Sequence, residues 1–194
     1  DAMTFLPKTL QSIADLGYSV FSGGRDFDLN IIGIRSASRL AGSFDDEIQV
    51  WYQKSDQWHC RAWPVTCDPG VPWLENGLAK GTAILVEGQH RGCWTFGKHR
   101  GQYDALVQCK PMPVYRDANK DQILDLDSPI ETGIWGINAH KAGRNSNTVG
   151  RYSAGCQVFK RSADFTEFLA LCQQQKRANG WDTFTYTLVR SEDL

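Results

Sequence analysis

One histidine and one cysteine stand at the two ends of a polar loop that contains glycine. His140 ends the strand-like run GIWGINAH, and Cys156 follows 16 residues later, directly after the tripeptide SAG. A thiol attacks a carbonyl carbon as its thiolate, so it needs a neighbour that lowers its pKa or accepts its proton. Histidine is the usual partner because its pKa lies near neutrality. The spacing therefore favours a nucleophile and a general base brought together across the loop.

Two neighbours of this pair fit the same chemistry. Gly155 has no Cβ, which lets backbone N–H groups approach a substrate oxygen and stabilise an oxyanion. Asn138 precedes His140 by two residues, so on an alternating strand both side chains point to one face. We expect Asn138 to hold either the substrate or the histidine.

Basic residues surround the same loop. Lys141, Arg144 and Arg151 lie between or beside the histidine and the cysteine. Arginine can grip a carboxylate through two hydrogen bonds, so Arg144 and Arg151 are candidate ligands for an acidic peptide. The alternative is that these charges are only solvated by water.

The order of histidine, polar loop, Ser-x-Gly-Cys and strand resembles the signature of the L,D-transpeptidase catalytic domain (YkuD-type). The likeness is close over residues 134–159 and loose elsewhere. Two positions depart from the family pattern: Ala154 replaces the usual histidine before Gly-Cys, and Val158 replaces an arginine. The chain thus resembles a divergent branch of that family.

The resemblance implies a role for each matching residue. It makes Cys156 the residue that is acylated and His140 the base, oriented by the backbone carbonyl of Lys141. It also implies that Ser153 contributes to substrate binding and that Gly155 with Cys156 supplies amides to the oxyanion.

The implied reaction is acyl transfer on the stem peptides of bacterial peptidoglycan. The cysteine would attack the carbonyl on the L-centre of diaminopimelate, expel D-alanine and form a thioester. An amine acceptor would then give a 3→3 crosslink, whereas water would give L,D-carboxypeptidase or endopeptidase activity. This substrate implies a periplasmic or extracellular location at the cell wall; no targeting residue indicates it.

Two other functions remain open from the sequence. The same pair could serve a cysteine peptidase or amidase with a different substrate. Alternatively, the chain is a non-catalytic cell-wall or carbohydrate-binding module that uses its seven tryptophans, with the cysteine buried and inert.

Short runs rich in β-branched and aromatic residues dominate the rest of the chain and predict strands. The expected strands cover residues 29–35, 47–53, 58–66, 82–88, 103–109, 112–117, 133–140 and 183–190. Helices are expected over residues 4–16 and from Ser162 to about Gly180, where a good N-cap and a glycine stop frame an amphipathic pattern.

The fold class predicted is mainly β (α+β), a YkuD-like β-sandwich or mixed sheet with two or three flanking helices. We expect one catalytic domain over residues 1–194, with an N-terminal helix and lead-in at 1–28 and the catalytic segment at 133–159. Residues 68–81 are expected to form a surface loop. Residues 88–103 are expected to form a basic loop or hairpin with an aromatic face, or else a rim that recognises an anionic ligand.

Composition narrows the function classes further. A formal net charge of −1 argues against a general nucleic-acid binder. No apolar run approaches the length of a membrane span, and the start lacks a basic and then apolar leader. Six cysteines are too few for a disulfide scaffold, although Cys60 and Cys67 could close a short loop. We expect no cofactor and no metal among the site residues.

A second constellation is acidic. Asp117, Asn119, Asp121 and Asp125 stand at positions 1, 3, 5 and 9 of a calcium-loop template, with oxygen ligands at alternate positions. Gln122 replaces the glycine of position 6, and Ser128 stands where a bidentate glutamate belongs. A hairpin with an acidic tip is the expected structure of this segment, and calcium binding is left open.

Overall fold

Eight strands of the chain pair into a closed mixed sheet. The computed structural model describes residues 5–143 and 146–194. Around the sheet, the strand order is β1-β11-β5-β6-β9-β10-β3-β2. The pairs β1/β11 and β9/β10 are parallel and the other pairs are antiparallel. The strands are β1 (Asn30–Arg35), β2 (Asp46–Lys54), β3 (Gln57–Thr66), β5 (Gly88–His99), β6 (Tyr103–Gln108), β9 (Ala139–Lys141), β10 (Gln157–Phe159) and β11 (Thr183–Arg190).

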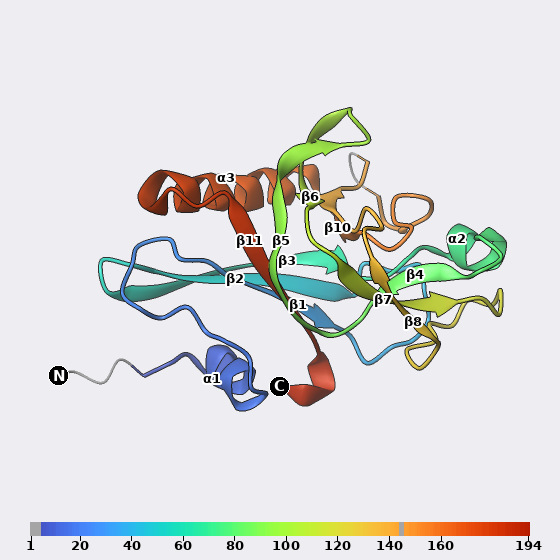
Figure 1. Ribbon diagram of the computed structural model, residues 1–194, viewed down its shortest axis with the longest axis horizontal. Helices are drawn as coiled ribbons and strands as arrows, with labels where there is room; N and C mark the ends of the chain where they lie inside the picture. Colours follow the sequence, from blue (N-terminus) through green and yellow to red (C-terminus); the bar gives the residue numbers. More distant parts are fainter. Residues whose placement is uncertain (1–4, 144–145) are drawn as a thin grey trace.

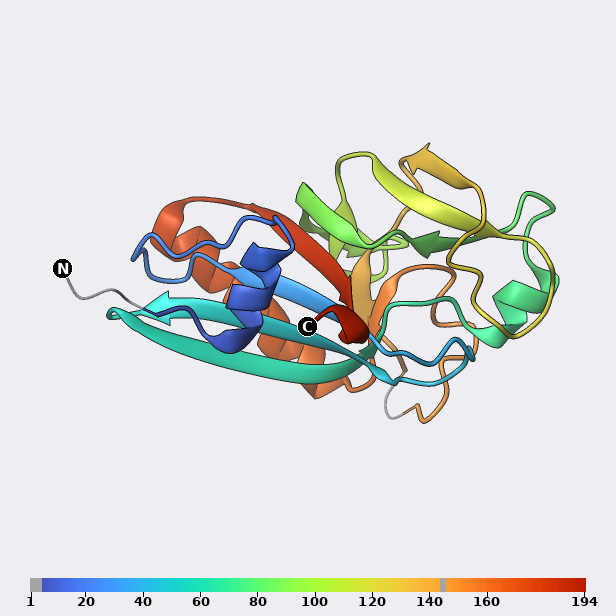
Figure 2. The same cartoon turned by 90° about the horizontal axis from the view of Figure 1, so that it is seen from below.

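A smaller antiparallel sheet stands beside the first. It has the order β4-β7-β8, with β4 at Thr82–Leu85, β7 at Met112–Asp117 and β8 at Ile130–Gly133. The short helix α2 (Val71–Asn76) lies next to this sheet, at the right of both views (Figures 1 and 2).

Two longer helices cover the large sheet. The amphipathic helix α1 (Lys8–Asp15) buries Leu10 and Ile13 against Ile32 and Val189, and the C-terminal end lies beside it in both views (Figures 1 and 2). Helix α3 (Ser162–Asn179) runs along the opposite side (Figure 1). Phe165 and Phe168 of α3 pack on Phe159 and Trp63, and Gly180 ends the helix with a left-handed φ of 75°. A single 3-10 turn, η1 (Ser191–Asp193), follows β11.

The interior of the large sheet is aromatic and contains polar groups that are paired. Trp94 and Tyr186 stack with ring centroids 4.4 Å apart. The Tyr186 hydroxyl donates to Oε1 of Gln157 at 2.7 Å. A Cβ at Gly33 would collide with the same hydroxyl, so glycine is needed there. This network fixes Gln157, the residue directly after Cys156.

A buried arginine connects the two sheets. Arg35 of β1 is fully buried and forms ion pairs with Asp68 at 2.9 Å and Glu87 at 2.7 Å. It also donates to the backbone carbonyls of Cys67 and Leu85, at 3.3 Å and 2.9 Å. Because a buried guanidinium is costly unless its donors are satisfied, these partners hold β4 against the end of β1.

The predicted class, mainly β with a mixed sheet and flanking helices, is confirmed. The main errors concern three segments. Residues 88–99, expected as part of a loop or hairpin, form the long strand β5, whose second half makes a hairpin with β6, so the hairpin is present and the loop is not. The segment 133–140 is not one strand: β8 ends at Gly133, and β9 begins only at Ala139. Residues 71–76 of the expected surface loop form α2.

Two further expectations can be compared with the structure. All six cysteines are described and none is disulfide-bonded, so the possible Cys60–Cys67 bridge is absent. In residues 5–143 and 146–194, each helix is too short or too polar to cross a bilayer.

Candidate active site

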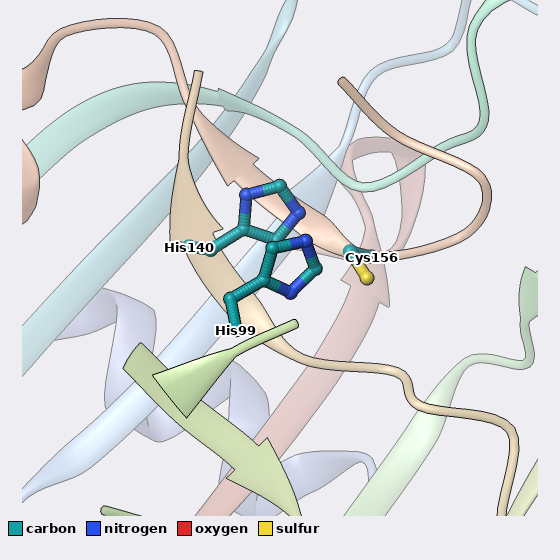
Figure 3. A group of neighbouring side chains, drawn as sticks. All are labelled: His99, His140 and Cys156. Carbon is teal, nitrogen blue, oxygen red and sulfur yellow. The ribbon is translucent and has the colours of Figure 1, made fainter. Parts of the chain in front are cut away.

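The parallel pairing of β9 and β10 brings the histidine and the cysteine together. His140 is the register partner of Val158, and the backbone N–H of Gln157 donates to the Asn138 carbonyl at 2.9 Å. Cys156 precedes Val158 by two residues, so its side chain lies on the same face of β10. The adjacent strand ends thus present an imidazole and a thiol side by side (Figure 3).

The imidazole of His140 is held in one tautomer. Its Nδ1 lies 2.8 Å from the carbonyl oxygen of Lys141 and therefore carries the proton. The hydroxyl of Tyr103 lies 3.0 Å from the same Nδ1 and donates to the Lys141 carbonyl at 3.2 Å. Nε2 is buried and has no hydrogen-bond partner among the described residues. His140 thus offers a free lone pair, and the contact expected for Lys141 is present.

The thiol of Cys156 is 8% exposed and lies among polar backbone groups. Its Sγ is 3.2 Å from the Gly136 carbonyl, and the Asn138 N–H donates to it at 3.5 Å. On its apolar side it packs with Ala142 and Val158. The sulfur is thus neither freely exposed nor enclosed by side-chain carbon alone.

A second histidine completes the cluster. The ring of His99, at the end of β5, stacks on His140 with centroids 3.8 Å apart (Figure 3). The ligating atoms of His99, His140 and Cys156 all lie within 4.8 Å of one another, and no other such triad of histidine, cysteine or carboxylate occurs in the described chain. These are zinc ligands by type, but proton transfer between His140 and Cys156 would need the same atoms.

The side chain of Asn138 holds His99 rather than His140. Its Oδ1 accepts the backbone N–H of Gln108 at 2.9 Å, which fixes the orientation of the amide. Its Nδ2 therefore donates to His99 Nδ1, 3.2 Å away. The expected contact of Asn138 with His140 is therefore not formed, and the amide holds His99 instead.

Burial keeps the reactive pair neutral. It raises the pKa of the Cys156 thiol to about 11, although the Asn138 N–H opposes this shift. It lowers the pKa of His140 to about 4, and the neighbouring His99 adds to this effect. At pH 7 the resting state is therefore a thiol beside a neutral imidazole, and any attack by the sulfur would require its proton to move to a base.

In the turn before Cys156, the structure gives Ser153 and Gly155 roles that differ from those expected from the sequence. Ser153 is fully buried, and its Oγ donates to the Cys156 carbonyl at 2.9 Å and accepts the Gly155 N–H at 3.3 Å. The expected substrate contact of Ser153 is therefore replaced by a role in holding the turn. Gly155 has a φ of +121°, and a Cβ there would lie 2.6 Å from the Ala83 carbonyl oxygen. Since the Gly155 amide is bonded to Ser153, the Cys156 amide is the better oxyanion donor.

A hollow of about 400 Å³ opens beside this turn and reaches Ala154. Trp73 and Trp135 form aromatic walls. Lys80 and Arg116 lie over the Trp135 ring, 5.0 Å and 4.5 Å from its centroid. The hollow thus combines flat apolar walls with positive charge, which suits a peptide that carries carboxylates.

The predicted basic residues have different positions. Arg151 is exposed, and its guanidinium lies 5.9 Å from the Trp73 ring centroid at the edge of the hollow. The ammonium of Lys141 lies over the Tyr103 ring at 5.1 Å. Arg144 lies outside the described residues.

Sequence reasoning missed His99 and Tyr103 as site residues. They face each other across the β5–β6 hairpin, where His99 is the register partner of Tyr103. The available signal was a histidine and a tyrosine flanking the short turn RGQ. Two other basic residues of this segment have partners: the His90 ring contacts the Val86 carbonyl at 3.0 Å, and Lys98 pairs with Asp104 at 3.1 Å.

Comparison with known proteins identifies no relative of this chain. A scan against models of protein families finds no match to this chain, and searches of curated proteins and of solved structures find no similar protein.

Proposed function

We propose that the chain is a cysteine acyltransferase that acts on peptidoglycan stem peptides. One observation carries the enzymatic part: His140 has a free, buried Nε2 and an Nδ1 tied to Lys141, and the ligating atoms of His140, His99 and Cys156 all lie within 4.8 Å of one another. This is the arrangement of an oriented base beside a nucleophile. The substrate class rests on the sequence resemblance and on the cationic, aromatic hollow beside Ala154.

The proposed first half-reaction uses residues already in place. Sγ of Cys156 bonds to the carbonyl carbon of diaminopimelate while its proton passes to Nε2 of His140. The Cys156 N–H stabilises the oxyanion. The carbon–nitrogen bond to D-alanine then breaks, and His140 returns the proton to the leaving amine. The product is a thioester on Cys156.

The second half-reaction depends on the acceptor. An amine of another stem peptide attacks the thioester, gives a 3→3 crosslink and regenerates the thiol. Water in its place gives a tripeptide stem and hence L,D-carboxypeptidase activity. The proposed site of action is the cell wall, in the periplasm or outside the cell.

A carbapenem provides a direct test of the nucleophile, because it acylates a cysteine only where a working base and oxyanion site assist. We expect mass spectrometry of peptides to find the adduct on Cys156 in the parent protein and no adduct in His140→Ala. The exposed Cys60 and Cys109 are internal controls for nonspecific labelling. An adduct that survives His140→Ala unchanged would contradict the assigned base.

The substrate is tested separately by digesting muropeptides after incubation with the protein. New 3→3 dimers indicate transpeptidation, and tripeptides formed from tetrapeptides indicate carboxypeptidation. An acylated Cys156 without either product would reject peptidoglycan and leave a cysteine amidase of another substrate class. No adduct and no product would favour a non-catalytic module.

A further inference from the structure

His99 belongs to the triad with His140 and Cys156, but the proposed reaction gives it no task. Its ring is stacked on His140, and one nitrogen of each ring and the sulfur of Cys156 lie within 4.8 Å of one another. Both rings extend toward the side chain of Cys156 (Figure 3). A polar side chain this close to the sulfur lies within reach of a substrate bonded to it.

Hydrogen bonds determine which nitrogen of His99 carries the proton. The Asn138 Oδ1 accepts the Gln108 N–H at 2.9 Å, so the NH₂ group of Asn138 is the one that lies 3.2 Å from His99 Nδ1. Since an NH₂ group only donates, Nδ1 accepts, and the proton of the neutral ring is on Nε2. Burial and the charge of Arg100 lower the pKa of His99, which keeps the ring neutral at pH 7.

The two stacked histidines therefore have opposite tautomers. His140 carries its proton on Nδ1, facing the Lys141 carbonyl, and offers a lone pair at Nε2. His99 offers an N–H at Nε2. Ring nitrogens form hydrogen bonds in the plane of the ring, whereas these two planes are inclined by only 19° with centroids 3.8 Å apart. The N–H of His99 is therefore not directed at His140 and stays available to another acceptor.

The same stacking is unfavourable for a metal ion at the triad. Zinc binds an imidazole nitrogen at about 2.0–2.1 Å along its in-plane lone pair, with its ligands at tetrahedral angles. Two nearly parallel rings direct their nitrogens side by side rather than to one point, and Nε2 of His99 already holds a proton. The triad is therefore better suited to hydrogen bonding and proton transfer than to metal binding.

The backbone around Cys156 leaves room for a second oxyanion donor. The N–H of Gly155 is bonded to the Ser153 hydroxyl at 3.3 Å. The N–H of Gln157 is bonded to the Asn138 carbonyl at 2.9 Å. Of these three consecutive amides, that of Cys156 is the one left for a substrate oxygen. Oxyanion sites of acyl transfer usually combine two donors, so the backbone supplies half of such a site.

We propose that His99 is a catalytic residue that donates its Nε2–H to the oxyanion formed when Cys156 attacks a carbonyl carbon. This assignment rests on the acyl transfer proposed above. As the sulfur–carbon bond forms, the carbonyl π electrons move to the oxygen, and the thiol proton passes to Nε2 of His140. His99 keeps its own proton throughout. When the carbon–nitrogen bond to the leaving group breaks, the carbonyl forms again and its hydrogen bond with His99 weakens.

Long-range ¹H–¹⁵N NMR of the imidazole rings tests the tautomers in the parent protein, without any substitution. At pH 7 we expect His99 to carry its proton on Nε2 and His140 on Nδ1, which gives the two rings opposite patterns of nitrogen shifts. A proton on Nδ1 of neutral His99 would overturn the proposal, whatever the activity of the protein.

His99→Phe tests the donor, because the new ring can still stack on His140. We expect the maximal rate of carbapenem acylation to fall roughly 100-fold, as on removal of one oxyanion donor, with little change in the half-saturating concentration. Iodoacetamide forms no oxyanion, so its alkylation of Cys156 should change less than about threefold. The matched control is His90→Phe on the same strand, whose ring contacts the Val86 carbonyl and which should react like the parent.

Equal losses of acylation and alkylation in His99→Phe would indicate a structural role and overturn the proposal, as would acylation at the parental rate. If His99→Phe does not fold, the NMR measurement on the parent decides. A parent protein that iodoacetamide alkylates on Cys156 but carbapenem does not acylate would reject the proposed function, and the donor role with it. Failure of the function is thus seen in the parent, whereas failure of the donor role alone is seen in the comparison of His99→Phe with the parent.

Discussion

At rest the thiol of Cys156 donates to the Gly136 carbonyl at 3.2 Å, and in the proposed reaction its proton passes to the free Nε2 of His140. The reaction rates of a resting thiol and imidazole depend on pH differently from those of a preformed thiolate–imidazolium pair. In the proposed reaction the neutral imidazole is the active form, so we expect activity above the pKa of His140 and its loss as the pH falls through about 4.

We therefore predict that the rate of carbapenem acylation stays level from about pH 7 to about pH 5 and falls near pH 4. Alkylation of Cys156 by iodoacetamide, which needs the thiolate, should instead rise steadily from pH 7 toward the thiol pKa of about 11. Stopped-flow acylation and peptide mapping measure the two profiles. Fast alkylation of Cys156 that is level between about pH 5 and pH 8 would indicate a preformed ion pair and contradict the neutral pair.

Tyr103 should act as a positioning residue for His140. Its hydroxyl contacts His140 Nδ1 and the Lys141 carbonyl but does not contact the sulfur. Loss of one such hydrogen bond costs about 1 kcal/mol, so Tyr103→Phe should slow acylation about fivefold. The carbapenem concentration at half-maximal rate should change little. Tyr18→Phe, in the cluster around α1, is the matched control, and an equal rate decrease in that variant would assign the effect to general destabilisation.

The site residues that the sequence could indicate are those close together in the chain. His140, Lys141 and Cys156 belong to one strand-loop-strand unit whose spacing can be read directly. His99 and Tyr103 reach the same place through the pairing of β5 with β6 and of β6 with β9. That second pairing is a single register pair, Leu106 with Ala139, and no local pattern specifies it.

At the scale of elements, the turn before β10 depends on the close approach of β4. Gly155→Ala would place a methyl group 2.6 Å from the Ala83 carbonyl and would also strain a φ of +121°. We expect it to lower the free energy of unfolding by about 1–3 kcal/mol from strain, with the collision adding to that, and to reduce acylation. Urea unfolding and the acylation rate measure both effects.

Gly101→Ala provides the matched control, because Gly101 has a φ of +70° with no atom within 4 Å of the added Cβ. Only the backbone strain of about 1–2 kcal/mol applies there. If the two substitutions lower the free energy of unfolding equally, the approach of Ala83 does not constrain the turn before β10.

The strands that alternate apolar and polar residues were predictable, as the 183–190 run shows by forming β11. Strand β5 was not, because glycines and basic residues interrupt its pattern. The hydrogen bonds of β5 with β11 and β6 outweigh the weak strand preference of those glycines and basic residues. In the 133–140 run the apolar pattern continues through Gly136, whose φ of +70° breaks the strand. A glycine within such a run can mark a break, and here the break places the Gly136 carbonyl on the sulfur of Cys156.

For the whole molecule, the junction of the two sheets depends on charges that respond to acid. Burial would raise the pKa of Glu87, but Arg35, the Tyr115 hydroxyl and Arg190 together lower it to about 2. Since the folded pKa lies below the unfolded value of about 4.5, the stabilisation is complete above about pH 4.5. It is then lost as the pH falls toward 2.

Acid should therefore lower the stability of the parent protein by protonating Glu87. The Glu87→Gln variant, which has no carboxylate at this position, should not show that loss. The shift corresponds to at most about 3 kcal/mol, which solvent screening at this partly exposed group reduces to about 1–2 kcal/mol. Urea unfolding at pH 7 and pH 3 should give a difference in stability between parent and Glu87→Gln that is about 1 kcal/mol smaller at pH 3, because part of the stabilisation remains at that pH. Glu131→Gln, which breaks an ion pair with Arg116 in which Glu131 is 45% exposed, should show little change between the two pH values. If the difference for Glu87→Gln is the same at both pH values, the pairing of Arg35 with Glu87 does not hold the smaller sheet, and with it the Ala83 carbonyl, against the turn before β10.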